Sequence, residues 1–282
     1  MKKQTIQTLA VTAAAVTLAA VAHAGNITVK GSDTLVILSQ KWAEVYMQKN
    51  PGTTIQVTGG GSGTGLAALL NGTTDICNSS RPMRVKEIAQ FMAKFKARPR
   101  EYKVCLDGIS VYVHKDNPVE KLSFPQLEAI FTGKITNWKQ VGGPAAPIAL
   151  YGRENSSGTY EFFKEHVLKG RDFAAATKTM PGTAAVIQGI AKDPNGIGYG
   201  GVAYGEGVKA IRVSKTDGGE AIAPSEEAVV AGTYPISRYL FNYVDPKKDT
   251  GEVAAFINWC ISDEGQAIVK NIGYFPLPKN MR

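Results

Sequence analysis

Four short clusters of glycine, serine and threonine contain the residue types that proteins use to hold an anion. They span residues 31–35, 59–65, 79–83 and 152–160. Each cluster lies where a strand-like run gives way to a helix-like one. A helix N-terminus offers unpaired backbone N–H groups and partial positive charge, glycine lets that backbone approach a ligand closely, and hydroxyls add neutral donors. The clusters therefore predict an oxyanion site.

The cluster at 152–160 also carries the positive charge that such a site needs. Arg153 is followed closely by Ser156, Ser157 and Thr159. A guanidinium can donate two parallel hydrogen bonds to one oxyanion, so we expect Arg153 to be the charged clamp. The competing interpretation is an ion pair between Arg153 and its neighbour Glu154.

The first 24 residues have the pattern of a secretory signal peptide. Lys2 and Lys3 precede an apolar stretch at 9–21, and Ala22-His23-Ala24 is a cleavage site of the A-x-A type. A membrane anchor fits less well, because the apolar stretch is short and contains threonines. No cysteine stands directly after the cleavage site, so a lipid anchor is not expected. The sequence thus predicts an exported, periplasmic protein that begins at Gly25.

Charge and cysteine content narrow the function classes. The formal charge of +8 falls by two when Lys2 and Lys3 leave with the signal peptide, and a mild positive excess suits anionic ligands. The basic stretch at 94–100 is typical of a solvated helix end, so no nucleic acid is expected. The three cysteines lie in apolar patterns that favour buried thiols. With few histidines after processing, no metal site is expected.

The four clusters are embedded in alternating strand-like and helix-like patterns. Asp33 or Thr34 is expected to cap the first helix, and Ser123 to cap that of 124–131. The alternation is typical of an α/β fold with a parallel or mixed sheet flanked by helices. Helices are expected at 35–49, 66–70, 85–97, 124–131, 183–191 and 253–269, with a further one from the Arg153 cluster through Leu168, and strands at 55–57, 75–78, 104–113, 148–151, 197–199, 208–213 and 239–244.

The pattern restarts after the turn at 116–118, which predicts two lobes. Residues 25–110 and 240–282 would form the first lobe, because the last helix returns to it, and residues 111–239 the second. Strands near 108–113 and 238–244 would cross between the lobes as a hinge. Anion clusters from different lobes would then face each other across a cleft that closes on the ligand.

Seven stretches, in the same order, resemble those of the phosphate-binding proteins of the phosphate-specific ABC importer. The resemblance covers essentially the whole mature chain and implies the type II periplasmic binding protein fold: two lobes, each a mostly parallel sheet flanked by helices, joined by a two-strand hinge. It further implies a monomer that delivers inorganic phosphate to an inner-membrane ABC permease, without cofactor or catalysis. The stretches are 31–35, 59–65, 79–83, 131–138, 153–160, 195–199 and 234–239.

The resemblance also implies which residues hold the phosphate. The ones that match the family are Thr34 and Leu35 of the first cluster, Ser62 of the second, and Arg153, Ser157, Gly158 and Thr159 of the fourth. Ser32, Asp33, Ser80 and Arg81 complete the predicted ligand-binding set. No catalytic residue is predicted.

One position departs from the family pattern. Where some relatives have an aspartate that accepts the ligand's remaining proton, this chain has Ser80, followed by Arg81. Such a carboxylate rejects fully deprotonated sulfate, because two acceptors would then face each other. Asp33 is the best substitute for it, and helix N-capping is the alternative role of Asp33. Arg81 would add a second charge at the site or pair with Asp33.

Two other functions compete with phosphate capture. An exported phosphatase or phosphotransferase would use a serine nucleophile with His114 or His166 as base. His166 lies about two helical turns beyond Thr159, which is too far for contact with that cluster. A sibling receptor would bind sulfate, arsenate or another oxyanion. The stretch 196–201 matches Gly-x-Gly-x-x-Gly, but it lacks a strand before it and a long helix after it, so no dinucleotide is expected.

Overall fold

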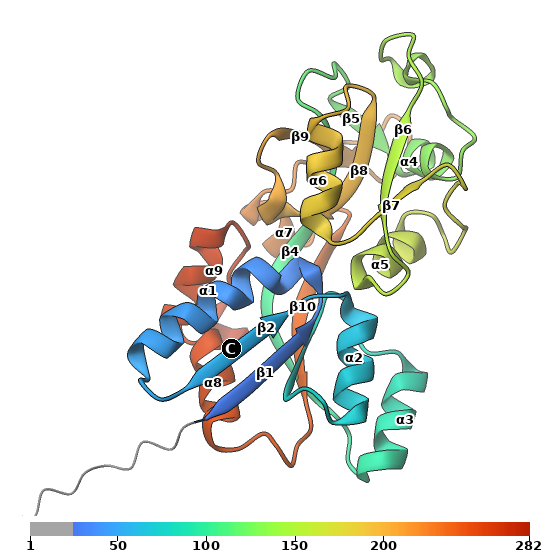
Figure 1. Cartoon of the computed structure of the whole chain (residues 1–282). Coiled ribbons are helices and arrows are strands. Elements are labelled where there is room, and N and C mark those ends of the chain that lie inside the picture. The colour runs from blue at the N-terminus through green and yellow to red at the C-terminus, as the bar shows by residue number, and fades with distance from the viewer. Residues whose placement is uncertain (1–24) are drawn as a thin grey trace, which may run out of the picture.

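The computed structural model describes residues 25–282, which form two lobes stacked one above the other (Figure 1). The predicted signal peptide, residues 1–24, lies outside the described residues. One mixed sheet runs through both lobes in the strand order β2-β1-β3-β10-β4-β8-β6-β7, with β9 paired to β4 and β5 paired to β9. The α/β architecture expected from the alternating patterns is therefore confirmed.

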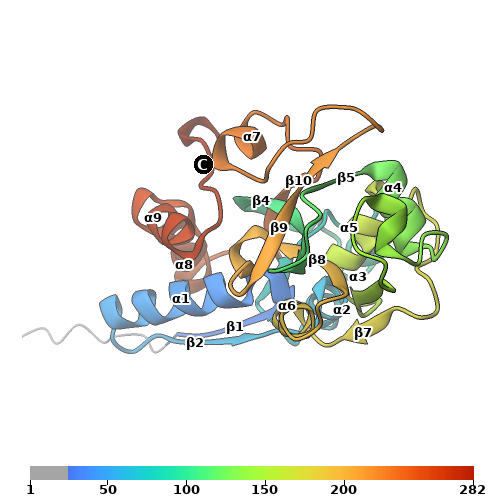
Figure 2. The same ribbon diagram turned by 90° about the horizontal axis from the view of Figure 1, so that it is seen from above.

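The first lobe is built on parallel strands that helices cover on both faces. Leu35, Leu38 and Trp42 recur at helical spacing along α1 and pack on Ile27 and Val29 of β1. Figure 2 shows α8 and α9 beside α1, and α2 and α3 on the other side of the lobe. The elements are β1 (Asn26–Gly31), α1 (Asp33–Lys49), β2 (Thr54–Thr58), α2 (Ser62–Asn71), β3 (Ile76–Ser79), α3 (Val85–Phe95), α8 (Gly251–Ile261) and α9 (Asp263–Ile272).

The second lobe has an aromatic core that fixes the helix carrying Thr159. Phe163 stacks on Tyr199 with ring centroids 4.2 Å apart, and Phe131 meets Phe163 edge to face. These contacts anchor α5 on β8, which sets the position of the α5 N-terminus. The elements are β5 (Lys121–Ser123), α4 (Phe124–Phe131), β6 (Ala149–Arg153), α5 (Gly158–His166), β7 (Lys178–Met180), α6 (Thr183–Ala191), β8 (Gly196–Gly201), β9 (Val208–Ser214) and α7 (Glu226–Val230), with short 3-10 helices at Trp138–Val141 and Val202–Tyr204. A last 3-10 helix, Lys279–Met281, lies near the C-terminus.

Two long antiparallel strands, β4 (Arg100–His114) and β10 (Ser237–Val244), connect the lobes. β4 pairs with β10 over residues 100–108 and then with β8 and β9 over residues 109–114. One strand therefore belongs to the sheet of each lobe in turn. The predicted boundaries near residues 110 and 240 lie within these two strands.

Several local predictions are wrong in detail. The helix expected at 253–269 is two helices that break at Ser262, whose hydroxyl accepts a hydrogen bond from Gly265 N and so caps α9. The N-cap of α1 is Ser32, so neither Asp33 nor Thr34 caps that helix. The expected cap by Ser123 is confirmed, with Gln126 completing a capping box. β1, β5, β7 and α7 were not predicted, and β1 precedes the first cluster directly.

The three cysteines behave as small buried hydrophobes, as predicted. Cys77, Cys105 and Cys260 are all free and fully enclosed. Burial raises the pKa of each thiol well above its usual range. Within residues 25–282, no helix has the length and apolar character of a bilayer span, and no three potential ligands among His, Cys, Asp and Glu are grouped as a metal would require.

Candidate functional site

Four buried hydroxyl groups from different parts of the chain meet between the lobes. Thr34 Oγ1 lies 2.8 Å from Thr159 Oγ1, Ser62 Oγ lies 3.2 Å from Ser80 Oγ, and Ser80 Oγ lies 3.4 Å from Thr159 Oγ1. Each of the four residues is at most 1% exposed. Thr159 belongs to the second lobe and the other three to the first. We refer to Thr34, Ser62, Ser80 and Thr159 as the hydroxyl cluster.

Three helix N-termini surround the hydroxyl cluster. Thr34 lies in the first turn of α1, Ser62 begins α2, and Thr159 lies in the first turn of α5. The α2 and α5 termini are in direct contact, because Gly63 N donates to Ser156 O at 2.9 Å. Each terminus contributes partial positive charge, and its first N–H groups point out of the helix and have no i−4 carbonyl partner within it. The site is therefore rich in neutral donors, as the sequence predicted.

Gly158 shows how closely the two lobes approach. A Cβ atom on this residue would lie 2.3 Å from Ser62 Oγ and 2.8 Å from Ser80 Oγ. A side chain at this point would force Ser62 or Ser80 to shift while the two lobes are in contact. Gly158 therefore permits a close approach of the two lobes, in addition to the close approach of backbone to a ligand that its cluster predicted.

Arg153 joins the two lobes through carboxylates. Its Nη2 donates to Asp33 Oδ2 at 2.6 Å, its Nε to Glu154 Oε2 at 2.9 Å, and its Nη1 to Thr183 Oγ1 at 2.9 Å. The side chain of Arg153 is 1% exposed. The ion pair with Glu154 that was the competing interpretation is present. Arg153 is also buried between the lobes, where the charged clamp was expected, although its contact with a ligand stays a prediction. The contact with Asp33 was not predicted.

Asp33 has donors on both of its oxygens. Oδ2 accepts from Arg153, and Oδ1 accepts from Gly60 N at 2.9 Å. The alternative role of helix N-capping is wrong, because Ser32 occupies the cap position. The geometry thus makes Asp33 a bridge between the first cluster, the second cluster and Arg153. Whether it also accepts a ligand proton stays a prediction.

Arg81 does not pair with Asp33, which corrects the expectation of that ion pair. Its guanidinium donates to both oxygens of Glu87, at 2.7 and 2.8 Å, and forms a further ion pair with Glu161 of α5. Burial raises the pKa of Glu161, and the charges of Arg81 and Arg84 offset this only in part. The same burial acts on Glu87, but hydrogen bonds from Arg81 and the Arg84 N–H outweigh it and lower the Glu87 pKa.

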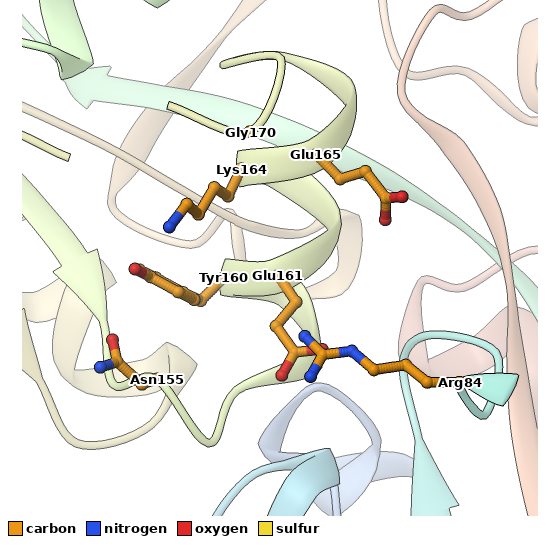
Figure 3. A pocket seen from close by; sticks show the side chains of 7 residues that line it. All are labelled: Arg84, Asn155, Tyr160, Glu161, Lys164, Glu165 and Gly170. Atoms are coloured by element: carbon orange, nitrogen blue, oxygen red, sulfur yellow. The ribbon is translucent and has the colours of Figure 1, made fainter. Parts of the chain in front are cut away.

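These ion pairs lie beside a surface pocket of about 480 Å³ that Figure 3 shows from close by. Arg84 of the first lobe points toward Glu161 of the second, with Nη2 and Oε2 2.8 Å apart. Lys164 and Glu165 add one charge of each sign to the lining. The pocket is therefore a second place where the lobes are joined by charge, and it is separate from the hydroxyl cluster.

The remaining predicted residues have structural partners at the same N-termini. Ser157 accepts from Tyr160 N at 3.2 Å and so caps α5. Leu35 N donates to Ser32 O at 3.0 Å in the first turn of α1. Ser32 itself is buried and precedes that turn. All three lie within two residues of a member of the hydroxyl cluster in the sequence.

Arg238 and Asp107 are at the site but were not predicted. Arg238 Nη2 donates to Thr159 Oγ1 at 3.0 Å, and Asp107, which is fully buried, accepts from both Nε and Nη2 of Arg238. A sequence signal was present, because each is a charged residue beside an apolar run: Asp107 follows residues 104–106, and Arg238 precedes residues 239–241. Arg238 also lies in one of the stretches that carried the family resemblance.

The two histidines are engaged elsewhere in residues 25–282. His114 Nδ1 accepts from Asp116 N at 3.3 Å, and the His166 ring stacks on Phe162 with Nδ1 2.9 Å from Phe162 O. Neither forms a hydrogen bond with a serine of the four clusters. The geometry thus gives no support to a serine nucleophile activated by histidine.

Comparisons with known proteins identify the family of this chain. Residues 17–264 match the model of a PBP superfamily domain. The chain is 37% identical over 270 residues to the phosphate-binding protein PstS of Pseudomonas aeruginosa, covering 90% of this chain and 84% of that protein. It is 32% identical over 259 residues to PstS of Staphylococcus haemolyticus, with 89% and 80% covered.

Solved structures of phosphate-binding proteins resemble this chain over most of its length. A Clostridium perfringens substrate-binding protein, ascribed to a phosphate ABC transporter and crystallised with bound phosphate, matches with a TM-score of 0.82 and 30% identity over 90% of this chain and 100% of that chain. An ABC-type phosphate transport receptor from Vibrio cholerae matches with a TM-score of 0.70 and 27% identity, over 90% and 100%. The predicted type II periplasmic binding fold is thereby confirmed.

Proposed function

Because this chain belongs to the PBP superfamily, and within it to the phosphate-binding proteins of ABC importers, we propose that it captures inorganic phosphate between its lobes and delivers it to a membrane permease. The observation that carries the proposal is the buried hydroxyl cluster at three helix N-termini. These are donors, and phosphate presents acceptor oxygens in several directions. Closure of the lobes completes the donor set.

We propose that affinity arises from many aligned hydrogen bonds. A hydrogen bond to a charged group contributes roughly 1.5 to 3 kcal/mol, and a helix N-terminus about 0.3 to 1 kcal/mol. Burial of the cluster keeps water from competing for these donors. The proposed ligand-binding residues are Ser32, Thr34, Leu35, Ser62, Ser80, Arg153, Ser157, Gly158 and Thr159, with Asp33 and Arg81 as charged neighbours.

We further propose that the protein is a monomeric periplasmic receptor that performs no chemistry. The A-x-A site after the apolar leader supports export to the periplasm. The positions of His114 and His166 support binding without catalysis. The permease is the partner that the family implies.

Titration calorimetry tests the proposed function. One phosphate should bind per chain, and small-angle scattering should show a smaller radius of gyration when phosphate is saturating. Hydrolysis of p-nitrophenyl phosphate should not exceed the buffer rate. Binding of sulfate or arsenate tighter than phosphate would favour the sibling receptor instead, and hydrolysis that Ser62→Ala removes would favour the phosphatase.

Substitution of Asp33 by asparagine tests whether this carboxylate only bridges Gly60 and Arg153 or also accepts the proton of hydrogen phosphate. Since both carboxylate oxygens already accept from Arg153 and Gly60, we expect Asp33→Asn to weaken phosphate and sulfate by the same factor, about tenfold. Calorimetry with both anions measures the ratio. A phosphate-to-sulfate preference that narrows by tenfold or more would show that Asp33 accepts the proton of hydrogen phosphate.

A further inference from the structure

Three arginines lie near the cleft, and their partners differ. Arg153 is flanked by the carboxylates of Asp33 and Glu154, and Arg81 by those of Glu87 and Glu161. Arg238 has a single carboxylate partner, Asp107. Of the three, Arg238 is the one whose N–H groups reach the hydroxyl cluster within the described residues.

The strand register places Arg238 where both lobes can be contacted. Arg238 of β10 lies directly opposite Asp107 of β4, at the end of the segment where these strands pair. Its Nη1 donates to Ser80 O at 2.8 Å and its Nη2 to Thr159 Oγ1 at 3.0 Å. The guanidinium therefore touches the first lobe and the second lobe at once, from the strands that connect them.

Asp107 holds this guanidinium in a fixed orientation. Oδ2 accepts from Nε at 2.9 Å and from Nη2 at 2.7 Å, while Oδ1 accepts from Val202 N at 3.0 Å. The side chains of Asp107 and Arg238 are 0% and 2% exposed. A buried guanidinium that is oriented before the ligand arrives loses little freedom on binding.

The contacts leave Arg238 able to donate to an anion. A guanidinium has five N–H groups. Nε uses its one, Nη2 uses both of its own on Asp107 and Thr159, and Nη1 uses one of two on Ser80 O. One N–H on Nη1 is free to donate. The Thr159 hydroxyl, which accepts from Nη2, can still donate its own proton to the same anion.

We propose that Arg238, oriented by Asp107, is the residue that places a positive charge on the phosphate held by the hydroxyl cluster. The proposal rests on the proposed function and adds a ligand-binding residue from the connecting strands to it. Arg153 joins the lobes at the edge of the site in addition to its proposed ligand contact, and Arg238 contacts the anion beside Thr159.

Calorimetry with inorganic phosphate on purified full-length variants tests the proposal. Arg238→Gln should weaken phosphate by about 10- to 100-fold, the effect of losing a charge-assisted hydrogen bond, and Arg238→Lys should recover part of that loss because the charge returns. Arg171→Gln, which removes a surface arginine paired with Glu128, is the matched control and should bind like wild type. If Arg238 only stabilised the fold, the Arg238→Gln protein would melt at a lower temperature, but its folded fraction would bind phosphate with unchanged affinity. Arg238→Lys would then give no recovery of affinity.

A crystal structure of the wild-type protein with phosphate provides a test that needs no variant. An Arg238 nitrogen within hydrogen-bond distance of a phosphate oxygen is expected. Bound phosphate without such a contact, or wild-type affinity in a folded Arg238→Gln protein, overturns the proposal and leaves the proposed function intact. Failure of wild type to bind phosphate removes both.

Discussion

Replacing Gly158 with alanine should weaken phosphate binding by about 100-fold and leave the free protein folded. The added Cβ would lie 2.3 Å from Ser62 Oγ, 2.9 Å from Ser62 Cβ and 2.8 Å from Ser80 Oγ. Gly158 belongs to the second lobe and both serines to the first, so the clash arises only on closure. Overpacking costs about 1 to 3 kcal/mol, and here it displaces two donors as well. Calorimetry gives the affinity and calorimetric melting the stability.

Gly63→Ala is the matched control for this prediction. Gly63 lies in the first turn of α2 at the same boundary, but its nearest contact to an added Cβ is Ser156 O at 3.3 Å, which a small shift can relieve. We expect affinity within about threefold of wild type. If Gly158→Ala bound phosphate as tightly as wild type, the lobes would not close on the ligand as they do in this structure.

Replacing Arg153 with alanine should also weaken phosphate strongly, by about two powers of ten. The change leaves Asp33 and Glu154 facing the cleft without their shared cation. Removing one partner of a buried ion pair costs about 3 to 5 kcal/mol. Asp33 and Glu154 are partly exposed, so we expect the loss of phosphate-binding free energy to be about 3 kcal/mol or less. Calorimetric titration with phosphate measures the loss.

Arg81→Ala provides the comparison. Arg81 pairs with Glu87 and Glu161 away from the hydroxyl cluster, so its loss should cost about tenfold or less. Adding Asp33→Asn to Arg153→Ala removes one uncompensated charge and should recover part of the affinity. If Arg153→Ala and Arg81→Ala lost the same phosphate affinity, the proposed place of Arg153 beside the phosphate site would be contradicted.

The sequence by itself determined most of the helices and strands and the loops at which the hydroxyl cluster forms. Glycine, serine and threonine at strand ends, and apolar spacing such as that of Leu35, Leu38 and Trp42, are local signals that are readable along the chain. They predicted the α/β class, the two lobes and the loops that contribute the hydroxyl cluster, whereas the family resemblance pointed to Thr34, Ser62 and Thr159 individually. The same local basis explains the errors: continuous amphipathic spacing conceals the break at Ser262, which depends on a single capping hydroxyl.

Only the tertiary structure decided which charges pair. Arg153 and Asp33 are 120 residues apart in the chain, and Arg238 and Asp107 are 131 apart. Any of several carboxylates could have served each arginine, because an ion pair depends on distance in space and has no fixed spacing in sequence. Sheet register sets Arg238 opposite Asp107, and lobe closure brings Arg153 to Asp33. Folding therefore determined which arginine reaches the hydroxyl cluster, since packing alone brings these distant positions together.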